Sequence, residues 1–496
     1  MRKSFKLFSL LLSLAFIMGL SSCSKKGDLL SYVPADAPIV VYGDLNYLLE
    51  QVGFTKKGEI EEPLKSIMEK ANMYTSEFRQ DAAFLKNYTK EAVLFFQGNK
   101  MWVIAGMTDT KAIIKEMANR GCTTDKESGV EIVKKGNDVV MFKDNKMFLC
   151  IDVVNERPLN EYMGVNDLCK LGNDSFASSK EMSKLTKKLK KDKSTLFGLV
   201  NLERLSTLAS YMNISQQELS NAQMAYSWVY NNPKYIDFFL NINKKGVNAV
   251  LEIRNSDMDP AKFSLPLGKI DVGALQYAYI ANNSIAVAAS IPNSLVTQVT
   301  NLISNYVPQD LISALNGLNG TVGCTLNLVA KTADDGVAYM ATCNSNNDAV
   351  QLGKIFQTPV SGLKCSTSGN YLRITFPGTS SSTSSISYAS ILEGKPFGAV
   401  CDLNLLIQNA GLSGTLSDMG TMAIYGDNED GSLAIKFEWN VDEPVKKVFD
   451  LVNNYQTIFK ALGNTGSFGS GSSYSSSYDF TDDGYEEDTD IEWDGF

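Results

Sequence analysis

The stretch IVVYGDLNYLL at residues 39–49 has a near-echo far down the chain, FGAVCDLNLLI at residues 397–407. Each begins with an apolar, β-favouring run, reaches Asp44 or Asp402, and continues with apolar residues at helical spacing. A short acceptor side chain caps the free N–H groups in the first turn of a helix, so this joint predicts a strand, an N-cap and a helix. The same plan recurs at residues 196–205, with Asn201 at the joint, and at residues 285–295, with Ser290.

The polar residue at the joint has two interpretations, a helix cap or a functional site used more than once. Across the four joints this residue varies among Asp, Asn and Ser. All three accept hydrogen bonds from backbone N–H groups, which suits a cap better than a catalytic group. We therefore predict structural helix caps at Asp44, Asn201, Ser290 and Asp402.

Hairpin signals follow each joint. After the first one, two apolar runs flank Gly98-Asn99, and a helical pattern with Asp109 or Thr110 as its cap comes next. This order predicts an α+β fold of repeated strand–helix–hairpin–helix units, with antiparallel sheets and helices on one face. Four such units are expected to pair into two similar domains, at residues 39–265 and residues 276–460.

The N-terminus resembles a bacterial lipoprotein signal. Three basic residues precede an apolar run at residues 7–20, which is too short for a transmembrane helix. The run ends in Leu20-Ser21-Ser22-Cys23, a lipobox-like sequence, and in such signals the Cys becomes the lipidated first residue. We expect a signal peptide at residues 1–22, lipidation at Cys23 and a tether at residues 23–38. An ordinary signal peptide with a chance Cys is the alternative.

The anchor would hold the folded body close to a membrane. Several acyl chains, at about 0.8 kcal/mol per buried methylene, hold a protein there stably. The tether from Ser24 to Ser31 reaches about 26 Å at most, at about 3.3 Å per residue. Surface-exported lipoproteins of Bacteroidota often carry acidic residues after the Cys, whereas Lys25 and Lys26 follow here. The expected location is the outer membrane, with the periplasmic face favoured over the cell surface.

The C-terminal residues 461–496 are rich in Gly, Ser and Tyr and then acidic. They hold nine carboxylates and no Lys or Arg. The charge of this tail therefore equals the formal net charge of the whole chain, −9. With few aliphatic residues to bury, this tail is expected to be disordered. Its end, DTDIEWDG, resembles the start of a calcium loop but lacks the closing Glu, so a solvated tail is preferred to a divalent-cation site. The neutral remainder argues against a nucleic-acid partner.

The composition excludes several kinds of chemistry. The chain has no histidine, which removes Ser-His-Asp and Cys-His catalysis and every His-ligated metal site. Seven cysteines follow Cys23 and none forms a CxxC motif. Cys324 and Cys343 could meet across a hairpin as a disulfide, and buried free thiols are the equal alternative. We expect no metal site and no cofactor.

The most basic segment is SSKEMSKLTKKLKKDK at residues 178–193. Its apolar residues recur at helical spacing, so it predicts a helix with a basic face. That face would either meet lipid phosphates or be solvated on the protein surface, and the solvated face is preferred. The residues that would meet the membrane are Lys184, Lys187, Lys188 and Lys191.

Motifs of known enzyme classes are nearly absent. The sequence has no phosphate loop, dinucleotide fingerprint or GxSxG elbow. No catalytic residue is therefore assigned, and a binding or scaffolding role is expected. The rival is a histidine-free hydrolase that uses a carboxylate pair on a glycan or peptide. A deep cleft with convergent carboxylates would favour the hydrolase, and a shallow apolar surface would favour binding.

After the lipobox, YVPADAPIVVYGDLNYLL at residues 32–49 resembles the start of an uncharacterised family of Bacteroidota lipoproteins. The resemblance rests on the VPADA segment, followed by a strand and an x-D-L helix start. It implies a lipid-anchored envelope protein and assigns no site residue. The expected partners are the membrane, through the anchor, and an envelope protein or glycan.

Overall fold

The structure is a computed structural model of the 496-residue chain. It describes residues 28–43, 47, 65, 69, 87–179, 183, 185, 196–209, 211, 215–280, 282–330, 336–357, 362–376, 386–414 and 416–454.

Nineteen antiparallel strands run through the described residues. They are β1 (Ile39–Gly43), β2 (Thr89–Gln97), β3 (Lys100–Met107), β4 (Thr123–Glu127), β5 (Val130–Lys135), β6 (Asp138–Lys143), β7 (Lys146–Asp152), β8 (Arg157–Pro158), β9 (Leu196–Asn201), β10 (Tyr235–Asn243), β11 (Gly246–Arg254), β12 (Ile285–Ile291), β13 (Leu318–Leu326), β14 (Val337–Cys343), β15 (Lys364–Ser368), β16 (Tyr371–Thr375), β17 (Phe397–Asp402), β18 (Thr421–Glu429) and β19 (Ser432–Asn440).

The helices precede the first strand, connect successive strands or follow the last strand. They are the 3-10 helices η1 (Asp28–Tyr32), η2 (Gly172–Asp174), η3 (Phe176–Ser178) and η4 (Ser387–Leu392), and the α-helices α5 (Thr110–Asn119), α6 (Tyr162–Leu168), α8 (Leu205–Ala209), α9 (Gln216–Val229), α10 (Val272–Ala278), α11 (Asn293–Ile303), α12 (Gln309–Leu315), α14 (Asn346–Phe356), α15 (Leu403–Asn409) and α16 (Pro444–Asn453).

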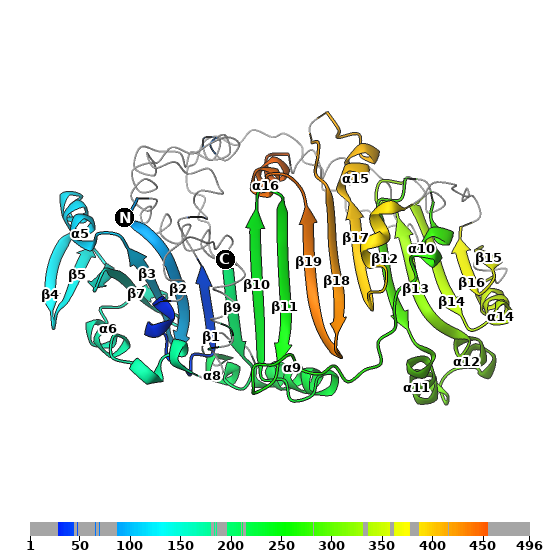
Figure 1. Ribbon diagram of the computed structural model, residues 1–496, viewed down its shortest axis with the longest axis horizontal. Helices are drawn as coiled ribbons and strands as arrows, with labels where there is room; N and C mark the ends of the chain where they lie inside the picture. The colour runs from blue at the N-terminus through cyan, green and yellow to red at the C-terminus, as the bar shows by residue number, and fades with distance from the viewer. Residues whose placement is uncertain are drawn as a thin grey trace, which may run out of the picture.

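The strands form one continuous twisted sheet (Figure 1). Their pairings give the order β4-β5-β6-β7-β3-β2-β1-β9-β10-β11-β19-β18-β17-β12-β13-β14-β16-β15, and the short β8 also pairs with β7. The turn expected at Gly98-Asn99 closes the β2–β3 hairpin, because Gln97 pairs with Lys100. The long-range order of the strands was not visible from these local signals.

The expected fold class, α+β with helices on one face of antiparallel sheets in two similar domains, is therefore wrong. Strands from residues 39–265 and from residues 276–460 belong to the same sheet, which β11 and β19 join through seven paired positions. The helices are not confined to one face either, because α10 and α14 pack on opposite sides of β14. The proposed domain boundaries themselves remain a prediction.

The strand pairing in the two halves of the sheet follows one scheme. On one side of the seam the order outward from β11 is β10-β9-β1-β2-β3-β7-β6, and on the other side the order outward from β19 is β18-β17-β12-β13-β14-β16-β15. Helices α5 and α14 follow corresponding strands, β3 and β14. The edge-to-edge pairing of β11 with β19 thus gives one long sheet from two similarly connected halves.

Each half of the sheet packs its main core on what we call the covered face. In the first half, Leu29 and Leu30 of η1 and Phe176 of η3 pack on Phe95 and Trp102. In the second half, Ala274 and Leu275 of α10 and Leu392 of η4 pack on Ala286 and Val400. Burial of these apolar side chains, at about 25 cal/mol per Å², is the main force that holds these elements on the sheet.

The other side, which we call the open face, is apolar along the whole sheet. Phe238, Leu251 and Ile435 are register neighbours on it across β10, β11 and β19. Helices α5 and α14 pack against its two outer ends, at Ala105 and Ala341. Between them, Val287, Tyr339 and Ile424 expose 38%, 45% and 50% of their surface. Large apolar groups on a folded surface mark a place where something else binds.

Candidate functional site

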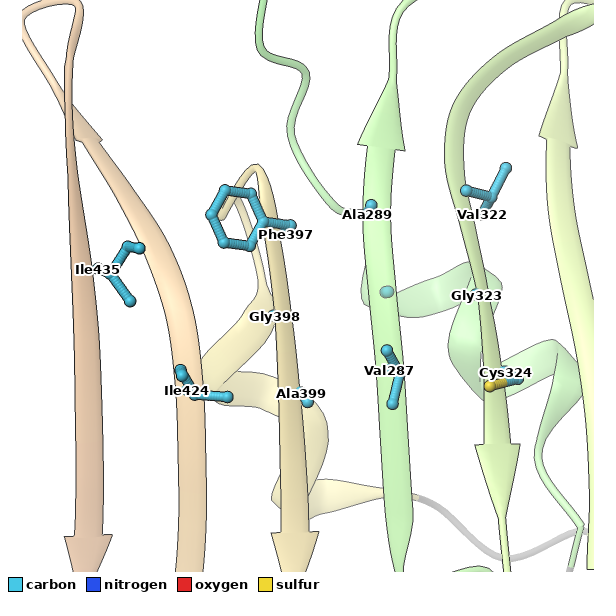
Figure 2. Close-up of a pocket in the computed structure, with 11 residues that line it drawn as sticks. Val287, Ala289, Val322, Gly323, Cys324, Phe397, Gly398, Ala399, Ile424 and Ile435 are labelled. Carbon is cyan, nitrogen blue, oxygen red and sulfur yellow. The ribbon is translucent and has the colours of Figure 1, made fainter. Parts of the chain in front are cut away.

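The open face is hollowed between β13 and β19. Figure 2 shows the hollow, which has a volume of about 510 Å³, with the side chains of Val287, Phe397 and Ile424 along it. Every lining residue is apolar, and together they are Val287, Ala288, Ala289, Val322, Gly323, Cys324, Phe397, Gly398, Ala399, Ile424 and Ile435. The volume falls in the range of small-ligand sites, yet the convergent polar groups that orient most ligands are missing from this lining.

Small residues in adjacent strands create the hollow. Strand pairing places Ala399 between Val287 and Ile424 in one row of the face. Ala289 pairs with Phe397 in the next row. Because the pleat carries alternate side chains to opposite faces, these rows expose short side chains between longer ones. The surface therefore dips where β12 and β17 run side by side.

Phe397 forms one wall of the hollow by lying across a glycine. A Cβ built on Gly426 would be 2.7 Å from the Phe397 ring, so only glycine leaves room for the ring. Gly198 likewise leaves room for the Phe238 ring in the other half of the sheet, because a Cβ on Gly198 would be 1.8 Å from that ring. Both rings thus extend the apolar surface of the open face.

The one heteroatom-bearing side chain in the lining is the thiol of Cys324. Desolvation by burial raises its pKa above the ordinary value, so the thiol stays neutral near pH 7. A protonated thiol behaves as a small hydrophobe and is a weak nucleophile. The hollow can therefore bind an apolar group, and this lining offers it no general acid, base or nucleophile.

For Cys324 and Cys343 the sequence left a disulfide and free thiols as equal alternatives, and in the structure both residues are free thiols. In the β13–β14 ladder, Cys324 faces Tyr339, whereas Cys343 faces Leu318. Cys343 therefore lies four residues, about 13 Å, along β14 from the position opposite Cys324. Disulfides need Cα atoms within about 7 Å, so the register excludes this one.

We expect the described thiols to react slowly while the chain is folded. Burial is the first cause that raises the pKa of Cys343 and of Cys401 from 9.0 to about 11, and the Asp348 and Asp402 carboxylates respectively add to it. Two pKa units lower the thiolate fraction about a hundredfold, so maleimide labelling of Cys343 and of Cys401 should be slower by about that factor than in the urea-unfolded chain. Labelling in urea without reductant should reach all seven cysteines from Cys122 to Cys401, whereas a disulfide would leave two unlabelled.

The four predicted helix caps have different outcomes. Asp402 is the N-cap of α15, where its carboxylate accepts from Leu405 N at 3.1 Å, as predicted. Asn201 accepts from Glu203 N at 3.1 Å, but α8 begins only at Leu205, so Asn201 closes a turn before the helix. Ser290 is not a cap, because it is a buried residue of β12 and Pro292 occupies the N-cap position of α11. Asp44 lies outside the described residues.

Several other predicted features also lie outside the described residues. They are the signal peptide at residues 1–22, the lipidation site Cys23, the four lysines Lys184, Lys187, Lys188 and Lys191, and the acidic tail at residues 461–496. Of the basic helix, Leu185 is described and is buried in the first core. In the part of the chain that the structure covers, no helix is both long and apolar enough to cross a membrane.

The carboxyl groups with displaced pKa values give the hydrolase hypothesis no support. Hydrogen bonds, first from Asn155 and Ser215 respectively, lower the pKa of Asp152 and Glu218. Desolvation raises the pKa of Asp427, but hydrogen bonds from Lys395 and Lys436 outweigh it and the net shift is downward. A general acid needs the opposite shift. Within the described ranges, no three Asp, Glu or Cys residues are grouped as a metal site would require.

Sequence reasoning missed the hollow, although part of its signal was present. The segments IAVAASI and FGAVC are apolar at consecutive positions, which predicts strands with two apolar faces. Only one face can pack on α10 and η4, so the other had to remain exposed or bind a partner. What the sequence did not reveal is that these two segments, more than a hundred residues apart, are adjacent strands.

Comparisons with known proteins give little further guidance. No family model and no curated protein matches the chain. Among solved structures, crystal form IV of TP0453 has 10% sequence identity and a TM-score of 0.28, and covers 45% of this chain and 79% of its own. Crystal form III of TP0453 has 9% identity and a TM-score of 0.28, and covers 70% of this chain and 91% of its own. Similarity at this level does not establish a shared fold.

Proposed function

We propose that the chain is a lipid-anchored protein of the cell envelope that binds rather than catalyses, and that the hollow of the open face holds a hydrocarbon chain. The observation that carries the proposal is the uniformly apolar lining of a surface depression of about 510 Å³. The anchor follows from the lipobox-like residues 20–23, and the outer membrane remains the expected location. An acyl chain makes no hydrogen bonds, so it suits a lining that offers none.

Affinity for such a ligand would come from the burial of apolar surface area alone. Each methylene buried contributes about 0.8 kcal/mol, so a chain that buries several methylenes offsets the cost of association. The hollow is shallow and open, which favours a flexible chain lying along the strands over a rigid polar molecule. An envelope lipid presents such chains, and the proposed anchor at Cys23 would keep the hollow near them.

Binding should be lost when charge is placed in the hollow. We expect Ile424→Lys to weaken binding of a fluorescent fatty acid by at least about tenfold, because the bound chain would have to desolvate an ammonium group. The measurement is a fluorescence titration of the full chain without vesicles. Val448→Lys on α16 is the matched control, because Val448 is a similarly exposed apolar residue (44%) outside the hollow.

A second variant removes the space without adding charge. Ala399→Trp should fill the hollow and displace the probe, while circular dichroism shows an unchanged fold. If the parent chain does not bind the fatty acid, or if Ile424→Lys and Val448→Lys bind it equally well, the hydrocarbon proposal fails.

A further inference from the structure

The most exposed apolar side chains of the described residues are not on the sheet face but beyond one end of its strands. Tyr306, Leu302, Trp228 and Met224 expose 86%, 78%, 70% and 60% of their surface, more than any other large apolar residue described. Leu302 belongs to α11 and Tyr306 follows it, whereas Met224 and Trp228 belong to α9. The connection after β9 and the connection after β12 therefore both expose large apolar side chains.

Strand direction places these two connections at the same edge of the sheet. Six successive antiparallel pairings lead from β9 through β10, β11, β19, β18 and β17 to β12, so β9 and β12 run in the same direction. Helices α8 and α9 follow β9, and α11 and α12 follow β12. All four lie along the lower edge in Figure 1. We call this surface the aromatic edge, defined by Tyr211, Met224, Trp228, Val299, Leu302 and Tyr306.

Each helix of the aromatic edge exposes its apolar residues in a stripe. On α11, Val296 and Thr300 are buried against the fold, while Val299 and Leu302 point outward at a spacing of three. On α9, Met224 and Trp228 are exposed at a spacing of four. Residues at these spacings share one helix face, so each helix has an outward apolar stripe in addition to its packed side.

The chemistry of the edge fits a lipid surface. Helix α11, NSLVTQVTNLI, has no charged residue, and in α9 the one charge is Glu218 in the first turn. Trp and Tyr favour the boundary between headgroups and acyl chains, because each joins an apolar ring to a polar N–H or O–H group. Apolar helix faces laid parallel to a bilayer bury this kind of stripe.

The proposed anchor brings a bilayer within reach of the fold. Asp28, the first described residue, is five residue steps from Cys23, which is at most about 17 Å. On this step the inference rests on the anchor that the proposed function includes. We propose that the aromatic edge docks on the bilayer that holds the anchor, so that α9 and α11 lie in its interface and the sheet stands on the membrane by this edge.

Tryptophan fluorescence can test the docking directly, because the other described tryptophans are buried. Trp102 and Trp439 expose only 1% and 4% of their surface, and Trp493→Phe would remove the remaining tryptophan. In that background, vesicles of phosphatidylethanolamine and phosphatidylglycerol with acyl chains brominated near the headgroup should quench emission. Trp228→Phe should abolish the quenching. Emission that brominated and ordinary vesicles leave equal would overturn the proposal.

Paired variants separate docking from the hollow and from the anchor. In the chain that begins at residue 23 and carries Cys23→Ala, Leu302→Ser with Tyr306→Ser should lower vesicle partition by about tenfold. Phe356→Ser with Val448→Ser, which removes exposed apolar groups of α14 and α16 outside both the aromatic edge and the hollow, should leave partition unchanged. Equal partition of the two double variants would overturn docking by this edge. Fatty-acid binding by the hollow and acylation of Cys23, measured by mass spectrometry, can each fail without changing these results.

Discussion

Arg254→Met should lower the free energy of unfolding by about 3–5 kcal/mol, the cost of breaking a buried ion pair from one side. The guanidinium is 8% exposed and its Nε donates to Asp237 at 2.5 Å, where the carboxylate is fully buried. A second nitrogen donates to Glu252 and a third to Met258 O at 3.0 Å. Methionine of similar length keeps the packing but removes the charge and these donors.

Because of its position, loss of this cluster should destabilise both halves of the sheet. Tyr235 begins the β10–β11 hairpin and pairs with Arg254 at its end, and the Arg254 side chain reaches across to Asp237, two residues further along β10. Glu252 also pairs with Ala434 across the β11–β19 seam. Disruption here loosens the strand that joins the two halves, so unfolding should become less cooperative as well as easier.

Urea denaturation followed by circular dichroism measures the effect. Lys126→Met is the matched control, because Lys126 and Glu131 form an exposed ion pair of 2.6 Å and such pairs contribute about 0–1 kcal/mol. Adding Asp237→Leu to Arg254→Met removes both buried charges and should recover part of the loss. A loss below about 1 kcal/mol for Arg254→Met alone would contradict the assigned role.

Local features of the fold were predictable because they depend on a few consecutive residues. Asp109 and Asp402 cap their helices as expected, since each side chain reaches an N–H group three residues on. The prediction of a cap at Ser290 was wrong for an equally local reason. Pro292 fixes the backbone before α11, so the helix begins after the serine. The pattern of residue types at the joint was right, but one proline decided its geometry.

The single sheet and its hollow depend on contacts that no short pattern encodes. Strand β11 and strand β19 each belong to a hairpin that could have been an edge of a separate domain. Their pairing joins residues 246–252 to residues 434–440, nearly two hundred positions apart. The hollow likewise needs Val287 beside Ala399. Sequence periodicity indicates that a strand has two apolar faces, but it does not identify the neighbouring strand.

Trp102→Ala should lower the free energy of unfolding by about 3–5 kcal/mol, since the indole fills the centre of the first core. Trp102 is 1% exposed and stacks on Phe95 with ring centroids 6.5 Å apart. Gly164 packs against the ring edge, where a Cβ would be 2.9 Å from the indole. The neighbours are therefore fitted closely to this ring and cannot readily collapse into the space it would leave.

Trp102→Phe should be much milder, and Trp439→Phe is the informative comparison. The indole N–H of Trp102 has no hydrogen-bond partner among the described residues, whereas that of Trp439 donates to Met419 O at 2.7 Å. Both substitutions remove one ring of similar burial, but only the second leaves a buried carbonyl without its donor, at an added cost of about 1–3 kcal/mol. The urea midpoint should therefore be lower for Trp439→Phe than for Trp102→Phe. Equal losses of unfolding free energy in the two variants would show that the hydrogen bond to Met419 O adds no net stability.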